Sequence, residues 1–392
     1  MSAPLEGIKV LDLSRLLPGP FCSMLLADMG AEVIKIEAPG VGDYIRWWDP
    51  KLGNNSGMHV VLNRNKKSLT LNLKSETGKE IFRGLAKLSD VILEGFRPGV
   101  MDKLNLGYEN LSELNPKIVY CAISGYGATG PISKKAGHDI NFLALNGLLS
   151  YNGIDGKPTV PGVQIGDMGG GGLLAAFAIL AAIIAREKTG KGQFIDISMT
   201  DGAMVWNCLR FGNWIADGTI PAPGDGMLNG GFACYNVYET KDGKFMALGA
   251  LEPQFWSAFC QAVNRPDLDT PEYFKPGDHQ KELIQELSRI FRTRTRAEWV
   301  EFLKDVDCCC EPVLNLEEAS NSKMSRERGM IVEMEHHQWG KYLQLGIPCK
   351  FSETPGNILT HAPELGEHTD EILSDLGFSP EEIEQLRTKK VI

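Results

Sequence analysis

The sequence lacks the cysteine and histidine patterns that mark disulfide-rich and zinc-binding proteins. Its nine cysteines include no C-x-x-C pair, and three of them are adjacent at Cys308, Cys309 and Cys310, which is neither a disulfide framework nor a metal-ligand spacing. An H-E-x-x-H motif is also absent. We therefore expect no metal site, and a reducing, cytoplasmic environment.

Positive charge and long hydrophobic runs are also scarce. The formal net charge of −10 argues against a nucleic-acid-binding surface. The first 14 residues contain no basic stretch followed by an apolar one, so no secretory signal peptide is expected. The longest apolar run, residues 173–185, is shorter than a bilayer requires, so we expect a buried helix and no membrane association.

Motifs for nucleotide and ester chemistry are missing as well. There is no Walker loop and no G-x-S-x-G elbow. Residues 125–130, GYGATG, match G-x-G-x-x-G, but Pro131 and polar residues follow instead of an apolar helix. A dinucleotide fingerprint must open a helix, so this segment is interpreted as a glycine-rich turn.

What the sequence contains is an alternation of strands and helices typical of a parallel α/β fold. Strands are expected over 8–14, 31–39 (stopped by Pro39), 68–74, 90–95, 117–124 and 192–199, with helices over 19–30 and 75–89 among the segments between them. With 392 residues, 43% of them hydrophobic, two domains are expected. We predict a large α/β domain over 1–205, completed by 326–392, a crossing linker over 206–224, and a small α+β domain over 225–325. A hairpin at Asp242-Gly243 belongs to the small domain.

Three ionisable groups stand out against this background. Asp167 follows a strand-like segment and precedes four glycines that lead into a helix, which places a carboxylate beside helix N-terminal N–H groups. A simple N-cap would explain Asp167, but four glycines weaken a helix start and suggest that something bulky approaches the backbone. His138 and Asp139 lie between a glycine-rich loop and an apolar helix start, and Glu252 precedes Pro253, where a capping role is the alternative.

Several longer motifs are shared with one family. They include GIKVLDLSRLLPGP, LADMGAEVIKIE, EGFRPGV, SGYGATGP, AGHDINFLALNG, GDMGGGG, GKGQFIDISM, MLNGGFACYNVYETKDGKFMALGALEPQF and PVLNLEEA. In this order, from about residue 5 to 320, they resemble the family III CoA-transferase superfamily, and most closely its α-methylacyl-CoA racemase branch. The resemblance implies a Rossmann-like large domain plus a smaller α+β domain, interlocked as a homodimer.

The resemblance also assigns roles to the three ionisable groups. Asp167 matches a catalytic aspartate that racemases use as a base and transferases as a nucleophile. His138 matches the racemases' histidine on the opposite side of the thioester, and Glu252 matches the glutamate that pairs with it. Asp139 is interpreted as structural. No cofactor is expected to be bound permanently, since coenzyme A arrives as part of the acyl-CoA substrate.

The basic stretch NRNKKSLTLNLKS and the EGFRPGV motif are the parts of the resemblance that concern coenzyme A. Positive side chains suit its phosphates, although a charged run without family support is more often a solvated surface. The resemblance implies phosphate contacts from Arg64, Lys66, Lys67, Lys74, Arg97 and Lys35, and adenine contacts from Leu71 and Leu73.

The predicted function is therefore racemisation or epimerisation at C2 of 2-methylacyl-CoA thioesters through an enolate. Backbone N–H groups near Asp167 and its glycines are expected to hold the enolate oxygen and to keep Asp167 ionised. The alternative is a CoA-transferase with an aspartyl-CoA intermediate at Asp167. The glycine-rich loop of such transferases is weak here, since only Gly230-Gly231 occupies its place. A CoA-binding module without catalysis would not need three ionisable groups at matched motifs.

Overall fold

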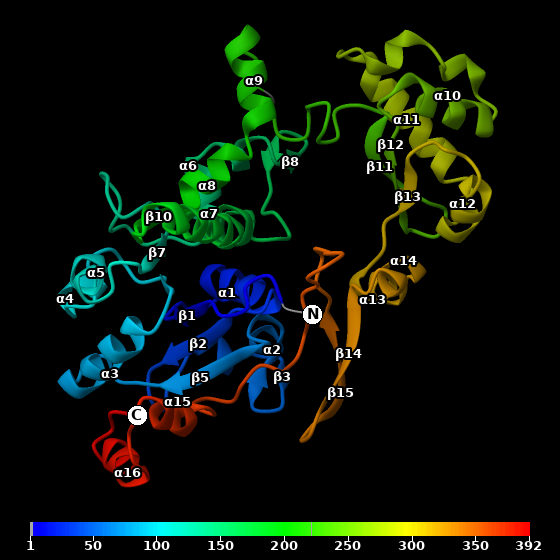
Figure 1. The fold of residues 1–392 in the computed structure, drawn as a ribbon. Helices are drawn as coiled ribbons and strands as arrows, with labels where there is room; N and C mark the ends of the chain where they lie inside the picture. Colours follow the sequence, from blue (N-terminus) through cyan, green and yellow to red (C-terminus); the bar gives the residue numbers. More distant parts are fainter. Residues whose placement is uncertain (1–2, 221) are drawn as a thin grey trace. The chain divides into compact units, whose positions relative to one another are not determined.

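The computed structural model describes residues 3–220 and 222–392 and divides the chain into two units (Figure 1). Unit 1 consists of Met1–Asn146, Val163–Trp206 and Lys323–Ile392, and unit 2 of Gly147–Gly162 and Asn207–Ser322. Compared with the expected domain limits, residues 147–162 lie in unit 2 instead of the large domain. The segment expected to be a linker also belongs to unit 2, apart from Trp206.

Unit 1 is built on a six-stranded parallel sheet with the order β10-β7-β6-β1-β2-β5. The first three strands of this sheet in chain order, β1, β2 and β5, follow one another towards one edge. The next three, β6, β7 and β10, follow one another towards the other edge, so the order reverses between β1 and β6. This is the doubly wound order of Rossmann-like domains, and it confirms the predicted fold class. The strands are β1 (Lys9–Asp12), β2 (Glu32–Glu37), β5 (Lys66–Thr70), β6 (Val91–Glu94), β7 (Val119–Ser124) and β10 (Phe194–Ser198).

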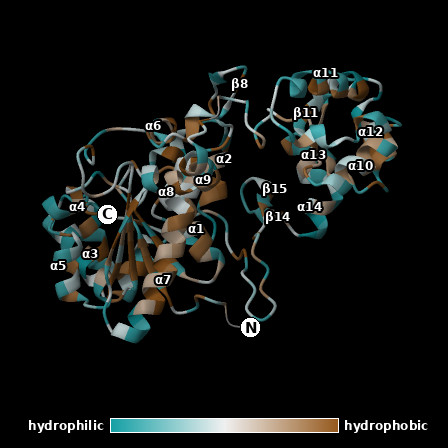
Figure 2. Cartoon of the chain, turned by 90° about the horizontal axis from the view of Figure 1, so that it is seen from above, coloured by the Kyte–Doolittle hydropathy of each residue, from teal (hydrophilic) through white to brown (hydrophobic). Residues whose placement is uncertain are grey.

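Helices cover both faces of this sheet, because successive strand residues point to opposite faces. Leu11 packs into a cluster with helices α3, α5, α15 and α16, whereas its neighbour Val10 packs into a second cluster with α1 and α7. The sheet and α7 are among the most hydrophobic parts of unit 1 (Figure 2). These helices are α1 (Pro18–Asp28), α3 (Glu76–Lys87), α5 (Tyr108–Leu114), α7 (Leu174–Thr189), α15 (Thr369–Asp375) and α16 (Pro380–Thr388).

The apolar run around residue 173 forms part of a longer helix than the sequence suggested. The π-helical stretch η3 (Ile165–Leu173) continues directly into α7, giving 25 helical residues with a mean hydropathy of 2.2 in their most apolar window. Length and composition alone would allow this helix to cross a membrane, contrary to the expectation. One such helix is weak evidence for a membrane span, because the core helices of other proteins share these properties. Ala175 and Ile179 of this helix are fully buried in the core cluster that includes residues of the parallel sheet.

Unit 2 has an aromatic core under a three-stranded antiparallel sheet. Its strands are β11 (Tyr235–Glu239), β12 (Phe245–Gly249) and β13 (Cys310–Pro312), and the first two form the hairpin predicted at Asp242-Gly243. Trp256, Phe259 and Trp299 are fully buried beneath them. The segment expected to be a linker contains a helix, α9. The helices are α9 (Cys208–Asp217), α10 (Pro253–Ala262), α11 (His279–Phe291), α12 (Arg296–Leu303) and α13 (Leu316–Asn321).

The chain returns to unit 1 through a hairpin and ends beside the sheet. Strands β14 (Ile331–His336) and β15 (Gly340–Leu345) pair antiparallel. Further on, the hydroxyl of Thr369 accepts a hydrogen bond from Thr70 N at 3.1 Å, and Val391 O accepts one from Asn72 N at 2.7 Å. The remaining elements are η1 (Tyr44–Trp47), β3 (Lys51–Leu52), β4 (Asn55–Ser56), α2 (Gly57–Leu62), α4 (Val100–Lys103), α6 (Asp139–Leu145), η2 (Leu148–Ser150), β8 (Gly153–Ile154), β9 (Lys157–Pro158), α8 (Met199–Val205), η4 (Pro266–Leu268), η5 (Pro271–Phe274) and α14 (Lys323–Glu327).

Candidate active site

Asp167 lies in the first turn of η3, the π-helical stretch that precedes α7. π-helical geometry is rare and is found mostly as short insertions, frequently at functional sites. The sequence suggested that the glycines after Asp167 leave room for a ligand. In the structure, other parts of the chain already occupy that space. A Cβ on Gly170 would lie 2.6 Å from Ala203 N, and one on Gly172 would lie 2.6 Å from Pro18 O. They are needed because the backbones of α8 and α1 pack directly against η3.

Asp139 links Asp167 to the segment that carries His138. The Asp139 carboxylate accepts a hydrogen bond from Asp167 N at 2.9 Å. Asp139 is the first residue of α6, and His138, immediately before it, is the N-cap residue. The His138 backbone N–H donates to Asn141 Oδ1 at 3.0 Å, and His138 is exposed. Asp139 therefore has a structural role that can be described: its carboxylate connects the start of α6, which follows His138 directly, to the backbone of Asp167.

Burial, followed by the negative charge of Asp139, raises the pKa of Asp167 to about 7. The sequence interpretation expected local N–H groups to hold Asp167 ionised, and the structure differs. No hydrogen bond is among the causes that act on this carboxyl group. A carboxyl group with a pKa near 7 can release and take up a proton at neutral pH, which suits general acid–base chemistry.

The backbone donors expected to hold an enolate oxygen are partly occupied. Asp167 N donates to Asp139, and Met168 N donates to Gln164 O at 2.9 Å. These two N–H groups therefore already have partners inside the protein. Stabilisation of the oxyanion by the other N–H groups of this stretch stays a prediction.

Glu252 is the N-cap residue of α10 in unit 2, yet its carboxylate makes no capping hydrogen bond. The residue is exposed. Capping was the simple alternative for a glutamate before a helix, and the structure does not support it. Because Glu252 belongs to unit 2 and His138 to unit 1, their pairing stays a prediction.

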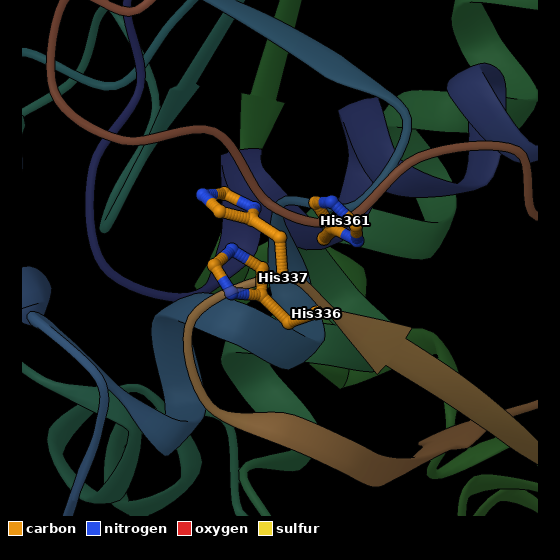
Figure 3. A group of neighbouring side chains, drawn as sticks. All are labelled: His336, His337 and His361. Carbon is orange, nitrogen blue, oxygen red and sulfur yellow. The ribbon is translucent and has the colours of Figure 1, made fainter.

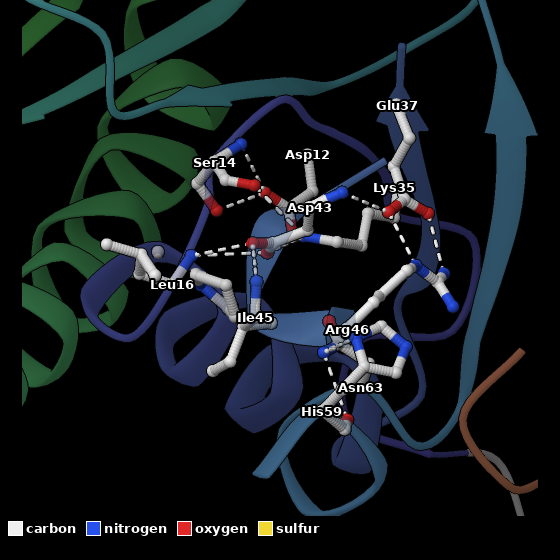
Figure 4. Close-up of polar contacts among 12 residues, drawn as sticks. Asp12, Ser14, Leu16, Lys35, Glu37, Asp43, Ile45, Arg46, His59 and Asn63 are labelled. Atoms are coloured by element: carbon white, nitrogen blue, oxygen red, sulfur yellow. Dashed lines mark hydrogen bonds and ion pairs between the residues drawn. The ribbon is translucent and has the colours of Figure 1, made fainter. Parts of the chain in front are cut away.

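Three of the cations predicted to bind phosphates are buried inside unit 1 and paired with carboxylates of the chain itself. Lys35 Nζ lies 3.1 Å from Asp43 Oδ2 and donates to Ser14 O (Figure 4). Arg64 holds both oxygens of Asp28, at 3.0 and 2.6 Å. The exposed fraction of both cations is at most 1%.

Lys66 is buried in the same way, 3.5 Å from a carboxylate oxygen of Asp12, and burial lowers its pKa to about 8. Because Lys35, Arg64 and Lys66 are enclosed and already neutralised, the structure argues against phosphate contacts from them. Positive charge in a sequence does not distinguish a solvated cation from a buried ion pair, so the burial of these three cations could not be predicted from residue type.

The remaining residues of the predicted coenzyme A site divide by exposure. Leu71 is 2% exposed and lies in the sheet core, so it cannot flank an adenine ring in this structure. Leu73 is half-buried at the edge of that cluster. Lys74 is exposed, and Lys67 is partly exposed, 2.7 Å from Glu371.

Arg97 lies where a doubly wound sheet usually binds its ligand. It is exposed and follows β6, next to the point where the strand order reverses between β6 and β1. Ligands of such sheets bind outside the carboxyl ends of the strands at this switch point. Arg15 follows β1 at the same edge, and its guanidinium lies 5.1 Å from the centre of the Phe96 ring. Sequence reasoning missed Arg15, although a basic residue directly after the first strand was the available signal.

Comparison with known proteins gives a consistent family. The family model described as CoA-transferase family III matches residues 5–369. Human α-methylacyl-CoA racemase is 38% identical, with 99% of this chain and 97% of that protein covered. Human succinyl-CoA:glutarate CoA-transferase is 36% identical, with 95% and 86% covered. A crystal structure of a CAIB/BAIF family protein from Brucella suis matches with a TM-score of 0.84 at 28% identity, covering 96% of this chain and all of that one.

The match extends over nearly the whole chain and includes both racemases and transferases at similar identity. The motifs around Asp167 and Arg97 fall within the matched residues, as does the doubly wound sheet that positions them. This chain is an enzyme of the family III CoA-transferase superfamily.

Proposed function

We propose that this enzyme inverts C2 of 2-methylacyl-CoA thioesters by removing and returning the α-proton through an enolate. The observation that carries the proposal is the environment of Asp167, whose pKa burial raises to about 7. A group that alternates between base and acid works best when its pKa lies near the working pH. A carboxylate nucleophile, in contrast, must be ionised to attack.

In the proposed reaction Asp167 takes the α-proton from one face of the thioester. The electron pair of the C–H bond moves into the enolate, and the imidazolium of His138 then gives a proton to the other face. In the opposite direction His138 is the base and Asp167 the acid. Each general acid or base contributes about 10²–10⁴ in rate. The exposed Glu252 carboxylate is proposed to orient His138.

The test is incubation of a single 2-methylacyl-CoA epimer in heavy water with no free carboxylic acid. We expect one deuterium at C2 and conversion towards an equal mixture of epimers, followed by mass spectrometry and chiral analysis. Asp167→Asn keeps the side-chain shape but removes the base, and we expect it to lower inversion by about 10²-fold or more. Absence of exchange until an acid is added, followed by movement of CoA to that acid, would refute racemisation.

The second candidate is CoA transfer between carboxylic acids, which the 36% identity to succinyl-CoA:glutarate CoA-transferase favours. In that reaction the Asp167 carboxylate attacks the thioester carbonyl and displaces the CoA thiolate. The thiolate then attacks the resulting anhydride at Asp167, which releases the first acid and leaves an aspartyl-CoA thioester. Mass spectrometry of the intact protein after acyl-CoA is added would detect this adduct, and the racemase proposal expects none.

For the nucleotide end of coenzyme A we propose Arg97 as the main contact, with Arg15 beside it. Both side chains are exposed at the carboxyl edge of the sheet, next to the switch point. Lys67, Lys74 and Leu73 complete the proposed contacts, since they remain at least partly accessible. Guanidinium groups bind phosphates through two parallel hydrogen bonds, which suits this position.

We also propose that the chain forms a homodimer, as its family resemblance implies. Helix α7 and the end of η3 that leads into it support this, because Leu173, Phe177 and Ile184 are 44%, 69% and 61% exposed. Their spacing of four and seven residues places them on one helix face. A contiguous apolar face of this kind marks an interaction surface, and a second copy of this chain is the proposed partner.

A further inference from the structure

Three histidines meet at the tip of the β14–β15 hairpin in unit 1 (Figure 3). His336 ends β14, His337 follows it in the turn, and His361 comes from the segment between β15 and α15. One ring nitrogen from each lies within 4.8 Å of the others. This group could not be predicted from the sequence, since His361 is 24 positions beyond His337 and no metal-ligand spacing connects them.

The rings are held by aromatic contacts. His336 is 4% exposed and stacks on Trp339 with ring centres 4.0 Å apart, and the His361 ring meets His336 edge to face with ring centres 4.6 Å apart. His361 Nδ1 is buried and has no hydrogen-bond partner. A buried polar atom without a partner calls for an explanation, and a bound ion is one of the few available.

The electrostatic surroundings suit a cation. Glu364 and Glu367 interact electrostatically with His336, so negative charge is present nearby to balance a metal ion.

We propose that His336, His337 and His361 bind a divalent transition metal ion, with Zn²⁺ as the first candidate, and thereby fasten the hairpin tip to the segment that carries His361. Three imidazoles form a donor set that suits zinc, copper and nickel. The proposed site lies outside the acyl-CoA chemistry at Asp167 and is structural in role.

Binding requires a modest rearrangement. Tetrahedral zinc with Zn–N bonds of about 2.0–2.1 Å brings its nitrogens to about 3.3 Å from each other, so the rings must move closer than the present limit of 4.8 Å. His337 is exposed and free to turn. His336 Nδ1 accepts a hydrogen bond from Gln338 N at 3.2 Å. Ligation by His336 gives up this bond, because a metal on Nδ1 takes the accepting lone pair and a metal on Nε2 leaves the ring proton on Nδ1.

The experiment uses the full chain with a tag that contains no histidine, stripped with EDTA and titrated with ZnCl₂ by calorimetry. We expect saturation at one Zn²⁺ per chain. His361→Ala and His337→Asn should each weaken binding at least about tenfold. The matched control is His279→Gln, because His279 lies on α11 in unit 2 and should not alter the affinity.

A second readout does not depend on heat of binding. Co²⁺ gives visible absorption when bound to nitrogen ligands, and Trp339, which stacks on His336, should report binding by a change in fluorescence that Trp339→Phe removes. His337 is exposed, so His337→Asn should fold normally. No saturable binding at about 100 µM metal, or equal affinity in wild type and both variants, would overturn the proposal.

Discussion

At the scale of single residues, Asp139 acts on Asp167 through both a hydrogen bond and a charge. Its Oδ1 accepts the Asp167 N–H at 2.9 Å, and its negative charge is the second cause, after burial, of the raised pKa of Asp167. Asparagine offers the same acceptor oxygen without the charge. The substitution Asp139→Asn therefore separates the two effects.

We expect Asp139→Asn to move the acid limb of the pH profile to lower pH. Asp167 serves as a base only when ionised, so exchange that depends on it should fall about tenfold per pH unit below its pKa of about 7. Removing the neighbouring negative charge lowers that pKa, so activity should persist further into acid. The measurement is kcat/KM for deuterium exchange against pH. Asp139→Ala is the control, since it removes the acceptor too and should reduce the rate at every pH; an unchanged midpoint in Asp139→Asn would contradict the expected coupling.

Arg97 and Arg64 provide a matched pair of arginines with opposite predicted behaviour. Arg97→Ala should raise the KM for CoA thioesters about tenfold or more, because a charge-assisted phosphate contact is lost, with little effect on unfolding. Arg64→Ala leaves Asp28 buried without its partner and should cost about 3–5 kcal/mol of stability.

Thermal or denaturant unfolding measures the stability of both variants, and steady-state kinetics measures the KM. A pantetheine thioester, which has no nucleotide, is the control substrate and should be little affected by Arg97→Ala. Equal losses with both substrates would remove Arg97 from the phosphate site.

The residues of the predicted site differ in how they are placed in the structure, and the difference has a physical reason. Asp167, His138 and Arg97 lie in loops or at helix ends, where a motif and a position after a strand carry information. Lys35 and Arg64 lie in or beside strands, and their partners Asp43 and Asp28 are distant in sequence. Nothing local in a sequence shows whether a cation in a strand faces water or a buried carboxylate.

At the scale of elements, the close packing of η3 against α8 leaves no room for a side chain at Gly170, whereas the position of a Cβ on Gly84 in α3 is open. A Cβ on Gly170 would meet backbone atoms at 2.6 and 2.7 Å, and one on Gly84 would meet nothing within 4 Å. Gly170→Ala should destabilise the protein by at least about 1–3 kcal/mol. Gly84→Ala should stabilise it by about 0.5–1 kcal/mol, since alanine favours a helix interior.

Chemical denaturation of both variants gives the comparison. Because η3 carries Asp167, Gly170→Ala should also lower activity, and Gly84→Ala should leave it unchanged. Equal stability of the two variants would mean that η3 can move away from α8 at little cost.

Regular periodicity explains which elements the sequence predicted. The strands of the parallel sheet and the hairpin at Asp242-Gly243 follow from apolar runs and turn residues, and both are present. The π-helical geometry of η3 was not predicted, because it arises where backbones of distant elements meet its glycines. The segment that forms helix α9 was interpreted as a crossing linker, and in the structure none of the helix's residues is buried.

At the scale of the whole molecule, the exposed apolar face of α7 predicts how the chain associates. Phe177→Glu together with Ile184→Glu should reduce dimer formation, because two charges would be buried in the proposed interface. Light scattering after gel filtration measures the mass in solution. Leu88→Glu is the control, since Leu88 is 63% exposed at the end of α3 and should leave association unchanged. A monomeric wild type, or a dimer unaffected by the double substitution, would contradict the proposal.

The division of unit 1 into three stretches of chain determines the order in which the protein can fold during synthesis. Unit 2 is mostly one continuous stretch, Asn207–Ser322, and it leaves the ribosome before the last part of unit 1 exists. Until that part arrives, the edge of β5 has no cover, because its partners Thr369 and Gly366 are about three hundred positions away. An open strand edge pairs readily with other chains. The newly made chain should therefore be most prone to aggregate during the interval between completion of unit 2 and arrival of the C-terminal segment.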